Sequence, residues 1–171
     1  LEPLTTGALR RFMRNHRLVS DVPLAMNLDG FEQIRLIGDP EKCRKLAFAI
    51  LAQTAIWHTP NDLRIMVAAA ESMQDQWQGV KWLPHLQSPE TDGVGPVRMF
   101  ATSATDLSTI GARAQADSDH TPRVNLIVVD GLADVASTTF STPGTHATGL
   151  YLGTDDGLPR RIDPRVAFME I

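Results

Sequence analysis

Residues 31–70 read FEQIRLIGDPEKCRKLAFAILAQTAIWHTPNDLRIMVAAA, and this stretch decides the fold. Residues 31–37 have the character of a strand that ends at a Gly-Asp-Pro turn. A long helix is predicted over 40–58, because its apolar residues form a wide stripe and Thr59-Pro60 ends it. Leu63 to Ala70 is an almost continuous apolar run, which is typical of a strand covered on both faces.

The same alternation continues on both sides of this stretch. The pattern predicts strands over 97–102 and 124–129, with one or two edge strands in 150–171. Helices are predicted over 5–17, 72–78 and 103–115, and a polar loop over 87–96. A flexible loop is expected over 136–149, which is rich in Ser, Thr and Gly. Alternating strands and helices predict a layered α/β domain with a mostly parallel sheet and helices on both faces.

Length and composition exclude several classes of protein. The chain has 171 residues, which predicts one domain over 1–171. Its apolar fraction of 43% excludes disorder as the main state. The net charge of −4 and the lack of a basic block argue against a general nucleic-acid partner. No apolar run is long enough to span a membrane, and a single cysteine, Cys43, cannot form an internal disulfide.

The turn from Gly38 to Lys45 lies where a phosphate-binding loop would lie, between an early strand and a long helix. Such a loop reads G-x-x-x-x-G-K-[ST], so that glycine amides wrap the phosphates and a lysine reaches them. Only Gly38 fits. Cys43, Arg44 and Lys45 replace the second glycine, the lysine and the hydroxyl residue.

The residues after Gly38 favour an ordinary capped helix over a phosphate cradle. Asp39 is a good N-cap and Pro40 a good first helical residue. Asp39 and Glu41 bring carboxylates to the positive end of the helix, which is the place an incoming phosphate would use.

A second candidate is the strand that ends at Asp130. Four apolar residues followed by an aspartate resemble a Walker B strand, in which the aspartate supports Mg²⁺. Gly131 stands where a water-activating carboxylate would follow, and buried strands often end in Asp without any catalytic role. Arg44, Lys45 and Asp130 are therefore candidates for a degenerate nucleotide site, and no catalytic residue is predicted.

A third candidate is the segment WQGVKWLPH at 77–85, which holds two of the three tryptophans of the chain. It fits either a locally packed turn or a contact surface, since Trp supplies large area at interfaces. The candidate interface residues are Trp77, Trp82, Leu83 and His85. No metal site is predicted, because the five histidines lack ligand spacing.

Several segments in combination resemble one family. They are LEPLTTGAL at the start, RLIGDPEKCRKLAFAILAQTAIWHTPNDLRIMV in the centre, WQGVKWLPH, GPVRMFAT and VNLIVVDG. Over 1–134 the chain is similar to the domain between membrane anchor and first motor module in EccC. EccC is the FtsK/SpoIIIE-type ATPase of type VII (ESX) secretion systems in actinobacteria. The resemblance implies a P-loop-NTPase-like domain with a degenerate phosphate loop.

The resemblance also implies a setting. The domain is expected to be a fragment of a larger membrane-anchored protein at the cytoplasmic face of the bacterial inner membrane. Its implied partners are the other modules of that ATPase, membrane subunits of the secretion machine and WXG100-type substrates, in a hexameric assembly. No cofactor is expected in this domain, whereas ATP and Mg²⁺ belong to the parent protein.

Three functions follow as hypotheses. The first is a non-catalytic module that couples the membrane anchor to the ATPase modules that drive protein export. The second is an unorthodox ATP-binding or hydrolysing domain that uses Arg44, Lys45 and Asp130. The third is a docking module for a machine subunit or substrate, with Trp82 facing the partner.

Overall fold

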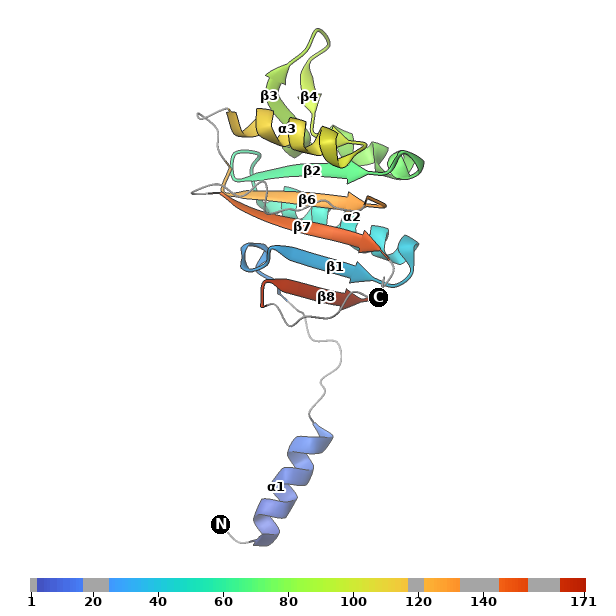
Figure 1. The fold of residues 1–171 in the computed structure, drawn as a ribbon. Helices are drawn as coiled ribbons and strands as arrows, with labels where there is room; N and C mark the ends of the chain where they lie inside the picture. Colours follow the sequence, from blue (N-terminus) through green and yellow to red (C-terminus); the bar gives the residue numbers. More distant parts are fainter. Residues whose placement is uncertain (1–2, 17–24, 117–121, 133–144, 154–163) are drawn as a thin grey trace.

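A computed structural model describes residues 3–16, 25–116, 122–132, 145–153 and 164–171. Its main sheet has six strands in the order β5-β2-β6-β7-β1-β8, and every neighbouring pair is parallel (Figure 1). The predicted α/β architecture with a mostly parallel sheet is confirmed. The strands are β1 (Gln33–Ile37), β2 (Leu63–Ala69), β5 (Phe100–Ala101), β6 (Val124–Asp130), β7 (His146–Gly153) and β8 (Val166–Glu170).

Helices cover the two faces of the sheet. The long helix α2 (Pro40–Trp57) packs on one face, and α3 (Ala104–Ala116) packs on the other, near β5 and β2 (Figure 1). Side chains of β2 alternate between the two cores: Val67 belongs to the α2 side and Met66 to the α3 side. Burial on both faces explains why β2 reads as one continuous apolar run.

The segment after β2 differs from its predicted form. Instead of one short α-helix and a loop, it contains the 3₁₀ helices η2 (Glu71–Trp82) and η3 (Pro84–Leu86). The polar loop predicted over 87–96 is a hairpin of β3 (Gln87–Thr91) and β4 (Pro96–Arg98). Its turn is closed by Asp92, whose Oδ1 accepts hydrogen bonds from the amides of Val94 and Gly95. Side-chain turn chemistry therefore makes strands from a polar sequence.

The prediction of a flexible loop over 136–149 is wrong at its end. Residues 146–149 lie in β7, a central strand between β6 and β1, while 133–144 lie outside the described residues. Small side chains fit there because α2 and η1 (Leu28–Gly30) pack against this strand. Thr148 is fully buried, and its hydroxyl lies 2.7 and 2.9 Å from the carbonyl oxygens of Leu28, in η1, and Phe31.

The helix α1 (Pro3–Asn15) lies apart from the sheet and its two helices (Figure 1). Its side chains from Gly7 to His16 are all exposed. Within the described part of the chain, no helix combines the length and the apolar character that crossing a membrane requires.

The parallel strands bring their carboxyl ends to one edge of the sheet. β1, β7, β6 and β2 are neighbours, so the turn after β1, the end of β6 and the start of η2 meet there. Ligands of open α/β sheets bind outside the carboxyl ends of strands. The candidate site is therefore at this edge.

Candidate functional site

The turn between β1 and α2 is a capped helix start. The Oδ1 atom of Asp39 accepts a hydrogen bond from the Lys42 amide at 3.0 Å, and Pro40 occupies the first turn. Glu41 adds a second carboxylate at the same end. The predicted cap at Asp39 is confirmed. The cap uses one free amide of the first turn and the proline removes another, so few donors remain for an anion.

A close backbone contact requires glycine at position 38. Its φ is +139°, and a Cβ atom on it would lie 2.2 Å from the carbonyl oxygen of Ile171. The amide of Ile171 donates to the carbonyl of Ile37 at 2.9 Å. The glycine therefore serves the packing of the C-terminal backbone against the end of β1 rather than opening a cradle for phosphate.

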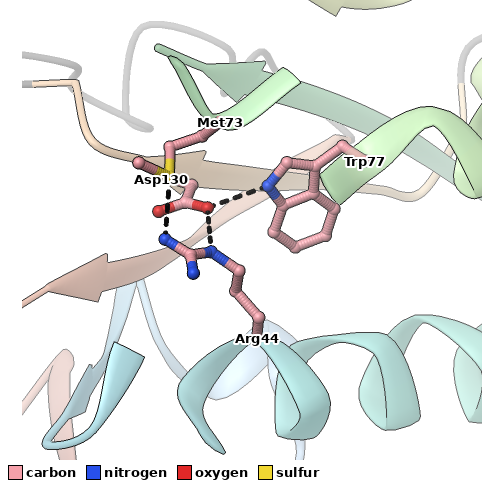
Figure 2. Close-up of polar contacts among 4 residues, drawn as sticks. All are labelled: Arg44, Met73, Trp77 and Asp130. Atoms are coloured by element: carbon pink, nitrogen blue, oxygen red, sulfur yellow. Dashed lines mark hydrogen bonds and ion pairs between the residues drawn. The ribbon is translucent and has the colours of Figure 1, made fainter. Parts of the chain in front are cut away.

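Arg44, Asp130, Trp77 and Met73 form a closed polar cluster at the edge of the sheet (Figure 2). The Nε atom of Arg44 lies 2.7 Å from Oδ2 of Asp130, and Nε1 of Trp77 donates to the same oxygen at 2.9 Å. A second guanidinium nitrogen of Arg44 lies 2.9 Å from the Met73 sulfur. The name Asp130 cluster is used below for these four residues.

Three elements position the Asp130 cluster. Arg44 projects from the second turn of α2, Asp130 is the last residue of β6, and Trp77 and Met73 come from η2. The positive φ of Gly131, +71°, turns the chain directly after Asp130. The Asp130 carbonyl accepts the amide of Ala70 at 2.9 Å, which fixes the start of η2 against the end of β6.

Burial makes these contacts strong. Trp77 is completely buried and its ring lies 4.7 Å from that of Phe48 on α2, while Asp130 is 4% exposed. Removing one partner of a buried ion pair leaves an uncompensated charge. The carboxylate that a Walker B-like function would offer to Mg²⁺ is thus held by a cation and an indole N–H.

The predicted nucleotide residues are only partly brought together. Arg44 and Asp130 meet, but each satisfies the other. Lys45 lies outside the Asp130 cluster, and its Nζ atom pairs with Glu41 at 2.7 Å on an exposed helix face. That hydrogen bond and the charge of Glu41 raise the pKa of Lys45.

The structure divides the four residues predicted as an interface. Trp77 and His85 are buried, so the contact surface predicted from them is wrong for this fold. Nε2 of His85 donates to the carbonyl of His58 at 2.9 Å, and Leu83 packs against the core. Of these four residues only Trp82 is exposed, at 81%, so it alone remains a candidate for a contact surface.

The 3₁₀ geometry explains this division. Residues three apart lie on the same side of a 3₁₀ helix, so Trp77 and Val80 both face the core and Trp82 does not. Met73 and Phe48 were not singled out from sequence. A three-residue period over 77–83 is the signal that points to the buried role of Trp77.

No metal centre is formed within the described residues, where no three His, Cys, Asp or Glu side chains gather. Cys43 is completely buried on α2, and burial is the main cause that raises the pKa of its thiol. A buried thiol of raised pKa is a poor nucleophile, which agrees with the structural role predicted for it.

Comparison with known proteins gives the family. No family model matches the chain. It is 38% identical over 144 residues to the ESX secretion system protein EccC of Thermomonospora curvata, a match that covers 77% of the chain. It is 33% identical to EccCa1 of the ESX-1 system and 32% identical to EccC5 of the ESX-5 system, both of Mycobacterium tuberculosis. These two matches cover 94% and 91% of the chain.

The chain is an EccC-type domain. The family predicted from the sequence is confirmed. The match spans 11% of the Thermomonospora EccC, 24% of EccCa1 and 10% of EccC5, so the EccC-type domain corresponds to a small part of each relative. Within the EccC-type domain, the edge of the sheet where the Asp130 cluster lies is the candidate functional site.

Proposed function

We propose that this EccC-type domain serves ESX (type VII) secretion as a non-catalytic, ATPase-like module. In this role it couples a membrane anchor to the ATPase modules that drive protein export. The support for a place in ESX secretion is the similarity to three relatives, each of which is named as an EccC protein of an ESX secretion system. The support for a non-catalytic role is local to the Asp130 cluster.

The non-catalytic role rests on one observation. Oδ2 of Asp130 accepts hydrogen bonds from both Arg44 and the buried Trp77. A magnesium nucleotide would have to displace both donors from this oxygen. Displacing both donors from the buried carboxylate is unfavourable, and the capped helix offers few amides in exchange. Gly131 supplies no carboxylate to orient an attacking water.

The wider setting is part of the proposal. The domain would lie at the cytoplasmic face of the inner membrane, between other modules of the same ATPase and membrane subunits of the machine. A hexameric motor that exports WXG100-type proteins is the expected context. In this context, the contacts of the Asp130 cluster join α2, β6 and η2. A displacement of one of these elements would therefore displace the other two.

Calorimetric titration of the chain with Mg-ATP tests the non-catalytic role. We expect no binding heat and no ATP turnover above background. Asp130→Asn and Lys45→Ala serve as matched variants. Wild-type binding that is lost in Lys45→Ala or Arg44→Ala would instead establish the unorthodox ATP site, and turnover abolished by Asp130→Ala would establish hydrolysis.

The coupling role needs the intact EccC protein that carries this domain. We expect Trp77→Phe, which removes the indole N–H together with part of the ring, to lower export of a WXG100-type substrate while ATP turnover stays near wild type. Val94→Ala is the control, because Val94 is 99% exposed. Equal export by both variants would contradict a coupling role for the Asp130 cluster.

A second candidate function is a docking module, favoured by one observation. Trp82 is 81% exposed although Trp77, Val80, His85 and Leu86 near it are buried, and tryptophan is enriched among the residues that dominate binding at interfaces. Binding of the chain to purified secretion-machine subunits should weaken at least tenfold in Trp82→Ala. Unchanged assembly and export by a folded Trp82→Ala protein would remove this candidate.

A further inference from the structure

A cation rests on an aromatic ring at the edge of the main sheet. The Nζ atom of Lys81, near the end of η2, lies 4.3 Å from the centroid of the Phe100 ring on the edge strand β5. Such a cation–π contact orients the ammonium group but supplies no carboxylate to balance its charge. Trp82 follows Lys81 directly in the chain and is 81% exposed. A cation and an exposed indole are therefore neighbours at this edge.

Arg98 brings a second cation to the same side. Residues 96–101 are extended almost throughout, as β4 and β5. Met99 and Ala101 belong to the core on the α3 side, whereas Phe100 packs against the core on the α2 side. Side chains alternate along an extended segment, so Arg98 lies on the side of Phe100. The name Arg98 surface is used below for Lys81, Trp82, Arg98 and Phe100.

The guanidinium group of Arg98 is poorly satisfied by the fold. Its Nη1 atom is buried and has no hydrogen-bond partner in the described part of the chain. Within the same residues, neither Arg98 nor Lys81 has a carboxylate partner. Asp92 in the adjoining hairpin is engaged in its own turn. A buried donor without an acceptor is costly, so Arg98 gains from an acceptor that comes from outside.

Arg98 can turn toward an incoming acid without breaking a hydrogen bond. The residue is half-buried rather than enclosed, and its side chain makes no hydrogen bond to a described residue. An arginine fork binds a carboxylate through two parallel hydrogen bonds. Trp82 adds apolar contact area beside the cations, and tryptophan and arginine are enriched among the residues that dominate binding at interfaces.

We propose that the Arg98 surface docks an acidic segment of a protein partner. A carboxylate of that segment binds Arg98 and Lys81, and an apolar neighbour of the carboxylate packs on Trp82. This inference rests on the docking function proposed for Trp82 and names the chemistry of the partner. Charge complementarity selects it, because both cations lack an acid among the described residues. A nucleic acid fits less well, since a phosphate backbone calls for many cations and the chain has a net charge of −4.

Urea unfolding of the whole chain separates docking from a structural role of Arg98. We expect Arg98→Met to keep or raise the unfolding midpoint, because methionine keeps an apolar stem and removes the unpaired buried donor. Arg10→Met is the matched control, since it removes one positive charge at an exposed position of α1. A midpoint clearly lower in Arg98→Met than in Arg10→Met would make Arg98 a stabilising residue of the fold and overturn its docking role.

Carbodiimide crosslinking tests the partner in a purified ESX membrane complex that contains the intact EccC protein. The reagent takes up water as a lysine amine and a nearby carboxylate condense to an amide, so it reports an acid bound at Lys81. We expect a peptide that joins Lys81 to a glutamate or aspartate of another subunit or module, with a yield about tenfold lower in Arg98→Met. Lys81→Arg is the matched control, because it keeps the charge but cannot form the amide. Absence of a Lys81 crosslink would overturn the proposal.

Photoreactive benzoylphenylalanine in place of Trp82 distinguishes this failure from failure of the docking function. A photocrosslink in the same complex to a segment that holds a carboxylate supports both. A photocrosslink to a segment without any carboxylate would leave the docking function standing and overturn the acidic partner. No photocrosslink to another subunit or module would contradict both. Saturable, Lys81-dependent binding of single-stranded oligodeoxythymidine to the chain would identify a nucleic acid and would also overturn the acidic segment.

Discussion

At the residue scale, the contacts of the Asp130 carboxylate bear most directly on function. Its position at the end of a buried strand suggests a metal-binding carboxylate, yet its partners are Arg44 and Trp77. In this structure an arginine and an indole N–H hold the carboxylate that a metal site would leave open. What distinguishes the two roles is which neighbours reach the carboxylate, and that depends on η2, a segment far from Asp130 in sequence.

Arg44→Ala should destabilise the domain, because it leaves the buried Asp130 carboxylate without its ion-pair partner. The expected loss in the free energy of unfolding is about 1.5–3 kcal/mol, since the Arg44 side chain is partly exposed and Trp77 still donates to the carboxylate. Trp77→Phe should cost at least about 1.5–3 kcal/mol, because it removes a hydrogen bond to a charged group and leaves part of the buried ring volume unfilled. Urea unfolding measures both losses. Wild-type stability in Arg44→Ala would contradict the assignment of the pair as structural.

Gly38→Ala tests the close backbone contact at the end of β1. A Cβ atom there would collide with the Ile171 carbonyl, and the φ of +139° disfavours any side chain. We expect a loss of about 1–3 kcal/mol in the free energy of unfolding. Gly79→Ala is the control, since nothing lies within 4 Å of its Cβ position. Equal stability of the two variants would rule out the contact.

At the scale of elements, α3 illustrates a boundary that sequence chemistry sets. Ser103 caps this helix, because its Oγ accepts a hydrogen bond from the amide of Asp106 at 3.1 Å. The hydroxyl of Thr102 donates to Oδ2 of Asp106 at 2.8 Å. The Thr102 hydrogen bond, and next that from Ser103, lower the pKa of Asp106.

This lowered pKa predicts a pH dependence. The folded pKa of Asp106 lies below its unfolded value, so its contribution to stability is present above the unfolded pKa, near 3.9. It is lost as pH falls through the folded pKa. Thr102→Val should reduce this acid-side loss while lowering stability slightly at neutral pH. Thermal unfolding at a series of pH values measures it, and an identical acid-side slope in both proteins would contradict the prediction.

The strand β7 illustrates an element that sequence chemistry hides. Residues 146–153 read HATGLYLG, with small residues and a glycine in place of a β-branched run. The strand forms because β6 and β1 supply hydrogen bonds on both sides, and Leu28 and Phe31 satisfy the Thr148 hydroxyl. Those partners are distant in sequence, so no local pattern predicts it.

At the scale of the whole molecule, α1 lies apart from the sheet (Figure 1). Deletion of residues 1–16 should leave the unfolding temperature of the monomer unchanged, because Gly7 to His16 are exposed. Calorimetry on dilute protein gives the unfolding temperature. A marked drop in that temperature would mean that α1 packs on its own body.

The sequence by itself determined the βαβ centre over 31–70, the capped start of α2, the buried strand β6 and the EccC-type family. These follow from periodicity, cap residues and motifs, all of which act over short distances along the chain. Only the tertiary structure decided that Trp77 points inward, that Arg44 closes on Asp130 and that β7 fills the centre of the sheet. Each depends on contacts between segments far apart in sequence, where burial and neighbouring hydrogen-bond partners outweigh local preference.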